Sequence, residues 1–211
     1  MSRILKVESD LNKDLDAIEQ GVEVIVKGGI VAYPTETYYG LGANAYDEKA
    51  VKKIFEIKGR SLKKPILVII GDRDQLFELI ERPPLHLEKL IDRFWPGPLT
   101  IVLRASPKLP DILLGDTGKI GIRISSHIVA RNLSLRANFP ITSTSANISG
   151  KQILTNALDI MREWGNRIDL ILDGGTLKNS RGSTIIDISE NHLLLIREGD
   201  ISFKDIEDVL H

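Results

Sequence analysis

Short apolar runs alternate along the chain with longer segments in which apolar residues recur at helical spacing. Seven runs predict β-strands, and several are unbroken stretches of Ile, Leu and Val, which is typical of strands buried on both faces. The runs are Ile30–Tyr33, Ile66–Ile70, Leu99–Leu103, Ile120–Ile124, Ile168–Leu172, Ser183–Ile188 and Leu193–Ile196. Helical spacing predicts helices over residues 12–27, 47–57, 73–81, 84–94, 126–137, 155–164 and 202–210. This alternation predicts an α/β fold rather than a helical bundle or a β-sandwich.

No break in this pattern divides the chain. The 211 residues contain no internal repeat, low-complexity tract or Ser/Gly-rich linker, and a chain of this length can bury a sizeable core. Residues 1–211 are therefore expected to form a single domain. The Trp95-Pro96-Gly97-Pro98 step is expected to end the helix over residues 84–94, because proline donates no backbone hydrogen bond.

Composition and charge exclude several classes of function. Lys and Arg number 28 against 29 Asp and Glu, so the net charge of -1 gives no long-range attraction to nucleic acid. The absence of Cys excludes disulfides, thiolate nucleophiles and cysteine-ligated metals, and the four His have no metal-ligand spacing. No signal-peptide core and no run approaching ~18 apolar residues is present. A cytoplasmic protein with no membrane association and no protein-bound metal is therefore expected.

Two segments rich in hydroxyl groups follow predicted strands. Residues 33–44 include Thr35, Glu36 and Thr37, and residues 141–150 begin as a short strand and continue as a cluster of hydroxyls with one amide. In an α/β sheet, ligands bind at the carboxyl ends of strands, where such groups hold phosphate oxygens or amino-acid backbones. Each segment is also consistent with a plain turn or a capping loop. Neither has the spacing of a P-loop or of a G-x-G-x-x-G motif.

The segment from Lys49 to Lys64 concentrates positive charge. It holds seven basic residues and one acid, a net charge of +6 in 16 residues. The lysines at 49, 52 and 53 are interpreted as the solvated face of the helix over residues 47–57. The cations Lys58, Arg60, Lys63 and Lys64 lie beyond that helix, on a connection where they could converge on a polyphosphate.

Two arginines adjoin apolar strand runs. Arg123 lies within Ile120–Ile124, and Arg197 follows Leu193–Ile196. A buried charge without a partner is costly, so each requires either an anionic ligand or an internal ion pair. No G-x-S-x-G motif supports a serine hydrolase. A site rich in cations and hydroxyls, without a nucleophile, suits group transfer by positioning and charge neutralisation.

Together these motifs resemble the YrdC family of threonylcarbamoyl-AMP synthases. The matching parts are Pro34-Thr35-Glu36-Thr37, Tyr39-Gly40-Leu41-Gly42, Lys58-Gly59-Arg60, Trp95-Pro96-Gly97-Pro98-Leu99-Thr100, Arg123, Ser145-Ala146-Asn147, Asp173-Gly174-Gly175, Ser183-Thr184 and Arg197. The resemblance implies one α/β domain with a twisted mixed sheet, flanked by helices, around a positively lined concave cavity. It also implies a nucleotidyltransferase that converts L-threonine, bicarbonate and ATP into threonylcarbamoyl-AMP and pyrophosphate. The product would supply the N6-threonylcarbamoyladenosine modification of tRNA.

The resemblance also assigns roles to individual residues. The catalytic signature is matched by Lys58, Arg60, Ser145 and Asn147, which should hold the ATP phosphates and the reacting carbamate. ATP contacts are expected from Arg60, Lys64, Ser145 and Arg197, and threonine contacts from Thr37, Arg123, Ser143 and Ser183. The Arg123 guanidinium would be the fork for the amino-acid carboxylate. Mg²⁺ is expected to arrive with ATP, without a cage of protein ligands.

Departures from the family pattern leave alternatives open. Some relatives have a His after the basic loop, where this chain reads Pro65 to Ile70, so a threonine contact from that position is absent. The chain ends 14 residues after Arg197 and resembles the short form of the family, which is expected to pass its product to a tRNA threonylcarbamoyl transferase. The alternatives are an RNA-binding module that holds tRNA on its basic face, or a paralogue that makes another carbamoyl-adenylate.

Overall fold

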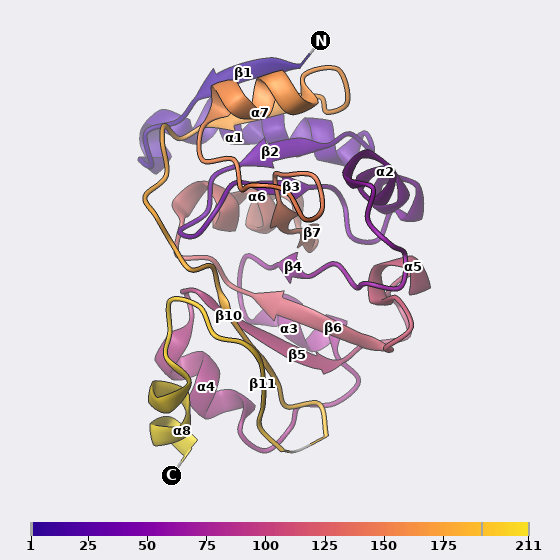
Figure 1. Cartoon of the computed structure of the whole chain (residues 1–211), viewed down its shortest axis with the longest axis vertical. Helices are drawn as coiled ribbons and strands as arrows, with labels where there is room; N and C mark the ends of the chain where they lie inside the picture. The colour runs from indigo at the N-terminus through magenta and orange to yellow at the C-terminus, as the bar shows by residue number, and fades with distance from the viewer. Residues whose placement is uncertain (1, 191, 211) are drawn as a thin grey trace.

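The computed structural model describes residues 2–190 and 192–210 and arranges their strands in two mixed sheets (Figure 1). The five-stranded sheet has the order β1 (Arg3–Lys6), β9 (Leu170–Asp173), β2 (Val31–Tyr33), β3 (Gly40–Gly42) and β8 (Thr144–Ser145). The six-stranded sheet has the order β11 (Leu194–Arg197), β10 (Thr184–Asp187), β5 (Leu99–Arg104), β6 (Lys119–Arg123), β4 (Val68–Ile69) and β7 (Ile141–Thr142). The mixed α/β class is confirmed, and its strands form two sheets where the sequence predicts one.

Eight helices occur in the described residues and pack around the sheets. They are α1 (Leu11–Val26), α2 (Glu48–Lys58), α3 (Asp74–Leu79), α4 (Leu87–Phe94), α5 (Asp111–Leu114), α6 (Ile128–Ala137), α7 (Ala157–Trp164) and α8 (Phe203–Leu210). In α1 the buried residues Ile18, Val22 and Ile25 recur at helical spacing, so one face packs on α6 and on the five-stranded sheet. Each predicted helix overlaps an observed one, and α4 ends at Phe94, before the predicted Trp-Pro-Gly-Pro stop.

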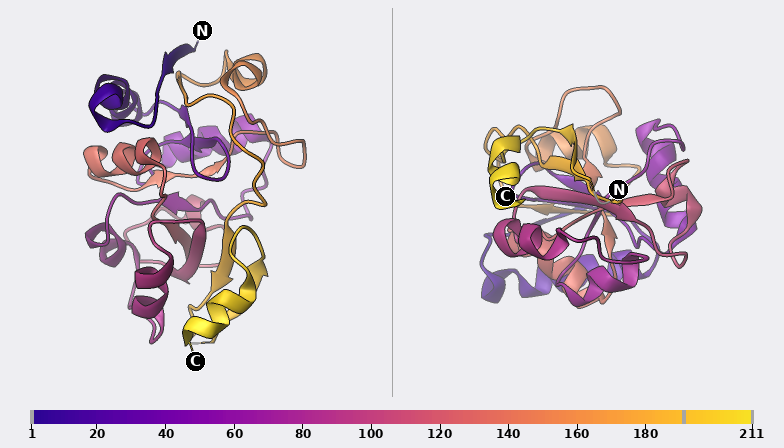
Figure 2. Two further views of the ribbon diagram at one scale, coloured as in Figure 1. Left: turned by 90° about the vertical axis from the view of Figure 1, so that its left-hand side faces the viewer. Right: turned by 90° about the horizontal axis from the view of Figure 1, so that it is seen from below.

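The side chains of both sheets meet in shared apolar clusters. One cluster of buried side chains includes Leu41 and Ile171 of the five-stranded sheet together with Ile101 and Ile122 of the six-stranded sheet. Figure 2 shows the extended segment after β9 running from the first sheet to the second. The two sheets are therefore joined by packing as well as by the chain.

Candidate active site

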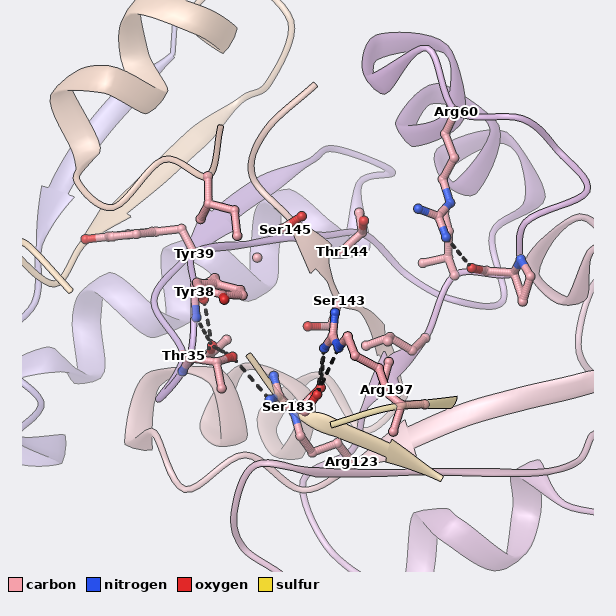
Figure 3. Close-up of a pocket in the computed structure, with 17 residues that line it drawn as sticks. Thr35, Tyr38, Tyr39, Arg60, Arg123, Ser143, Thr144, Ser145, Ser183 and Arg197 are labelled. Carbon is pink, nitrogen blue, oxygen red and sulfur yellow. Dashed lines mark hydrogen bonds between the residues drawn. The ribbon is translucent and has the colours of Figure 1, made fainter. Parts of the chain in front are cut away.

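A cavity of about 230 Å³ is lined by residues from both sheets (Figure 3). The lining consists of Thr35, Thr37–Gly40, Arg60, Pro65–Leu67, Arg123, Ser143–Ser145, Ile153, Ser183, Ile185 and Arg197. Of the ten residues with predicted roles, seven belong to this lining: Thr37, Arg60, Arg123, Ser143, Ser145, Ser183 and Arg197. The other three, Lys58, Lys64 and Asn147, lie outside it. The structure thus brings most of the predicted site together.

Arg123 ends β6 and is almost completely buried, with its side chain 4% exposed. Its Nη1 lies 3.2 Å from Glu36 Oε1 and donates a hydrogen bond to Thr37 Oγ1 at 3.3 Å. The second oxygen of Glu36 accepts a hydrogen bond from Ser125 Oγ. Of the two partners that the sequence left open for Arg123, the internal ion pair is therefore present. Its Nε is nevertheless enclosed by the protein without a hydrogen-bond partner among the described residues.

The turn after β2 is shaped by the hydroxyl of Thr35. Thr35 Oγ1 accepts hydrogen bonds from the backbone N–H groups of Thr37 and Tyr38, both at 3.1 Å, and donates to the Tyr38 carbonyl at 2.6 Å. Such side-chain bonds to the local backbone favour a turn over continued strand. The turn carries Thr37 to Arg123 and Glu36 to its ion pair. The segment is therefore a structured turn that also lines the cavity.

Arg197 lies beside Ser183 rather than free in the cavity (Figure 3). Its Nε and Nη2 donate to the Ser183 carbonyl at 3.1 and 2.7 Å, and Nη2 also donates to Ser183 Oγ at 3.0 Å. Burial lowers the pKa of Arg197. Arg197, which is predicted to contact ATP, therefore also holds Ser183, which is predicted to contact threonine.

Lys58 is the last residue of α2, and its side chain is directed into the protein. The residue is 2% exposed, and its ammonium donates hydrogen bonds to the carbonyls of Ser145 and of Asn147, the latter at 2.6 Å. Burial, and secondarily the charge of Arg60, lowers the pKa of Lys58 to about 8. The amide of Asn147 bonds to Ser145 Oγ at 2.5 Å and to the Lys151 carbonyl at 2.6 Å. Three of the four signature residues, Lys58, Ser145 and Asn147, therefore lie together, with Lys58 holding the backbone of the hydroxyl loop.

The four loop cations do not converge on one point. Gly59 caps the end of α2 with a φ of +58°, a left-handed conformation that glycine adopts readily and that turns the chain toward Arg60. Arg60 lines the cavity away from Arg123 (Figure 3), and its guanidinium donates to the carbonyls of Lys64 at 3.2 Å and Pro65 at 2.8 Å. Lys63 and Lys64 are exposed at the surface, as are the lysines at 49, 52 and 53 that the sequence assigns to a solvated face.

An apolar wall of the cavity was not predicted from the sequence. It is formed by Pro65, Ile66, Leu67, Ile153 and Ile185. For Ile185 a signal exists, because alternate residues of a strand share one face and Ser183 lies two positions earlier. In the described part of the chain, no three His, Asp or Glu side chains form a metal-ligand set, and no helix is long and apolar enough to cross a membrane.

Comparison with known proteins places the chain in a family. The Sua5/YciO/YrdC family, described as telomere recombination, matches residues 23–199. A threonylcarbamoyl-AMP synthase of Pyrococcus abyssi is 42% identical over 186 residues, which are 88% of this chain and 55% of the relative. A protein of Methanocaldococcus jannaschii, provisionally given the same name, is 38% identical over 209 residues, 97% of each chain. The chain therefore spans about half of the first relative and nearly all of the second.

A solved structure agrees with the sequence comparison. The crystal structure of P. abyssi Sua5 complexed with L-threonine has a TM-score of 0.91 and 38% identity to this chain, and the match covers 100% of this chain and 61% of that one. The fold and the motifs that line the cavity therefore lead to one conclusion: the chain belongs to the Sua5/YciO/YrdC family.

Proposed function

We propose that the chain is a threonylcarbamoyl-AMP synthase, a nucleotidyltransferase that converts L-threonine, bicarbonate and ATP into threonylcarbamoyl-AMP and pyrophosphate. One observation carries this proposal. Seven residues to which the family resemblance assigns a role line one cavity, in a chain 42% identical to a relative with that name. The related P. abyssi Sua5 forms a crystalline complex with L-threonine, which supports the same amino acid as a substrate here.

The cavity offers different groups at its two ends. Arg123 and Ser183 present hydrogen-bond donors at one end, beside Thr37, which suits the carboxylate of an amino acid. Arg60 lies at a distance from Arg123 and Ser183 (Figure 3), where it would face the phosphates of ATP. Three guanidiniums and no carboxylate occur in the lining, which supports the predicted positive character of the cavity.

The proposed reaction needs positioning rather than a protein nucleophile. Bicarbonate takes up a proton and releases CO₂ and water, and the neutral amine of threonine adds to CO₂ and loses a proton, which gives a carbamate. A carbamate oxygen then attacks the α-phosphorus of ATP, and the bond from that phosphorus to the bridging oxygen breaks as pyrophosphate leaves. Arg60 and Arg197 would neutralise charge on the phosphates, and Mg²⁺ bound to ATP would share that task. We expect Lys58 and Asn147 to contribute by holding the Ser145 loop, and Lys64 to approach ATP from the surface.

The two alternatives are less well supported. Five lysines of the basic segment are exposed and available to an RNA-binding module, whereas Lys58 is buried and Arg60 is turned into the cavity, where an RNA backbone would not meet them. A paralogue that makes another carbamoyl-adenylate would share this cavity. The two enzymes are therefore distinguished by whether the reaction depends on threonine and by which adenylate is formed. Direct tRNA binding, transfer of the product to a transferase, and a cytoplasmic location stay predictions from the resemblance.

Pyrophosphate release tests the proposal. We expect release from Mg-ATP only when threonine and bicarbonate are both present, and threonylcarbamoyl-AMP as the product by mass spectrometry. Arg60→Ala should reduce the rate strongly, whereas Lys89→Ala, on an exposed position of α4, should leave it unchanged. Release that does not depend on threonine, or a different adenylate, would overturn the proposal. Binding of tRNA that weakens steeply with salt, without pyrophosphate release, would instead favour the RNA-binding module.

A further inference from the structure

The hydroxyl of Ser183 accepts two hydrogen bonds. Thr100 Oγ1 donates to Ser183 Oγ at 3.0 Å, and Arg197 Nη2 donates to the same oxygen at 3.0 Å. A hydroxyl has two acceptor lone pairs and one proton, so both acceptor positions are used and the proton remains to be donated. Ser183 lines the cavity and donates to no acceptor among the described residues. Its proton is therefore left for a ligand.

Thr100 is completely buried in β5 and lies outside the cavity lining. It pairs with Ile185 of the adjacent parallel strand β10, which places it beneath the segment that carries Ser183. A Cβ added at Gly121 of β6 would lie 3.3 Å from Thr100 Cγ2, so the methyl group packs over this glycine while the hydroxyl reaches Ser183. The two branches of the side chain have separate contacts. A buried hydroxyl is costly unless it is hydrogen-bonded, and the bond to Ser183 satisfies it.

We propose that Thr100 is a positioning residue that acts through Ser183, fixing the Ser183 hydroxyl as a hydrogen-bond donor to the carboxylate of the amino-acid substrate. This inference rests on the proposed function. The ligand group must be an acceptor because Ser183 has only its proton left and the guanidinium of Arg123 carries donors and no lone pair. A carboxylate has two acceptor oxygens and no proton at neutral pH. Accepting hydrogen bonds from Thr100 and Arg197 also strengthens Ser183 as a donor, because bonds in a chain polarise one another.

Two matched pairs of variants separate the hydroxyl of Thr100 from its methyl. Thr100→Val keeps the shape and removes the hydroxyl, and Thr100→Ser keeps the hydroxyl and removes the methyl. Thr100→Ala lacks both groups and differs from Thr100→Ser by one oxygen. The Ser and Ala variants therefore form a second pair that isolates the hydroxyl, which can be used if Thr100→Val does not fold. The measurement is the dissociation constant of L-threonine for the whole chain by calorimetry, with the dissociation constant of ATP as the second readout.

The hydroxyl-free variants should bind L-threonine about two- to tenfold more weakly than their hydroxyl-bearing partners, the range expected for one hydrogen bond. ATP binding should be unchanged in all of them. If Thr100 served only to pack over Gly121, Thr100→Ser would lose affinity and Thr100→Val would not, and that result would overturn the inference.

A double-mutant cycle shows whether Thr100 acts through Ser183. In the Ser183→Ala background, Thr100→Val should cause no further loss of L-threonine affinity, because the group that it positions has gone. An equal loss in both backgrounds would refute the inference. If the unaltered chain itself fails to bind L-threonine, the proposed function is refuted. If it binds L-threonine and all variants of Thr100 bind it equally well, only the role proposed for Thr100 is refuted.

Discussion

The buried ammonium of Lys58 gives a prediction whose magnitude follows from the structure. Lys58→Met keeps the apolar stem and removes the charge. The two hydrogen bonds to the carbonyls of Ser145 and Asn147 are charge-assisted and contribute about 1.5–3 kcal/mol each. Against them stands the burial of the ammonium, since a pKa of about 8 instead of 10.5 corresponds to about 3 kcal/mol. The free energy of unfolding at pH 7 should therefore fall by only about 0–3 kcal/mol, and the variant should fold.

The pH dependence of this difference is the sharper test. The pKa of Lys58 is lower in the folded chain than the ordinary 10.5, so the unfolded chain binds more protons between pH 8 and 10.5. Over that window the free energy of unfolding of the unaltered chain should rise relative to that of Lys58→Met, by up to about 3 kcal/mol. Below pH 8 the difference should be constant. Urea unfolding of both proteins from pH 6 to 10.5 measures it, and the contributions of all other groups cancel in the subtraction.

Two parallel curves of unfolding free energy against pH would refute the reasoning, because they would mean that the amine is not desolvated in the folded state. Hydrogen exchange of the backbone amides from Ser145 to Lys151 offers a local check. Exchange there should be faster in Lys58→Met than in the unaltered chain, since the ammonium holds this loop. The rate of pyrophosphate release should fall strongly in Lys58→Met even though the variant stays folded.

Three further predictions concern two ion pairs and the unity of the fold. Glu36→Gln leaves the buried charge of Arg123 without its counter-charge and should lower the free energy of unfolding by about 3–5 kcal/mol in urea; a loss below 1 kcal/mol would contradict this. Burial alone would raise the pKa of Asp187, but hydrogen bonds from Lys119 and from a neighbouring Ser outweigh burial, so the pKa is lowered below 3.8. The ion pair therefore stabilises the folded chain above pH 3.8, and this contribution is lost as the pH falls through the lowered pKa. The stability difference between the unaltered chain and Lys119→Met should accordingly shrink in acid, and a difference that is independent of pH would refute the assignment. Thermal unfolding followed separately at each of the two buried tryptophans should give coincident transitions if residues 1–211 form one domain, and two midpoints would indicate two.

The elements that the sequence predicts are those with a continuous apolar signal. Each predicted strand overlaps an observed one, whereas β1, β3 and β8 escape prediction. Two of the four residues of β1 are charged and three are exposed, because it is an edge strand. In β3, Gly40 and Gly42 are glycines for a reason that only the pairing shows: a Cβ at Gly42 would lie 2.6 Å from Tyr33 Cε1. The division into two sheets depends on pairings between distant segments, which local pattern does not encode.

Lys58 shows where the site could have been predicted more accurately. The sequence pattern places it in a loop with other cations, yet it follows Val51, Ile54 and Phe55 at the spacing of a single apolar helix face. Extending the helix by one residue therefore predicts that its side chain points inward. The same extension could not have shown what it bonds to, because the carbonyls of Ser145 and Asn147 are contributed by a segment about ninety residues later.

The partners of the buried site residues explain why the site requires both sheets. Arg123 belongs to the six-stranded sheet, and the carboxylate and hydroxyl that it contacts, Glu36 and Thr37, belong to the turn after β2 in the other sheet. An arginine this deeply buried is costly without those partners, so the fully assembled site and the packed sheets stabilise one another. Separating the sheets would leave Arg123 without its ion pair and would dismantle the end of the cavity that we assign to the amino-acid carboxylate. Loss of this site and global unfolding should therefore occur in a single step.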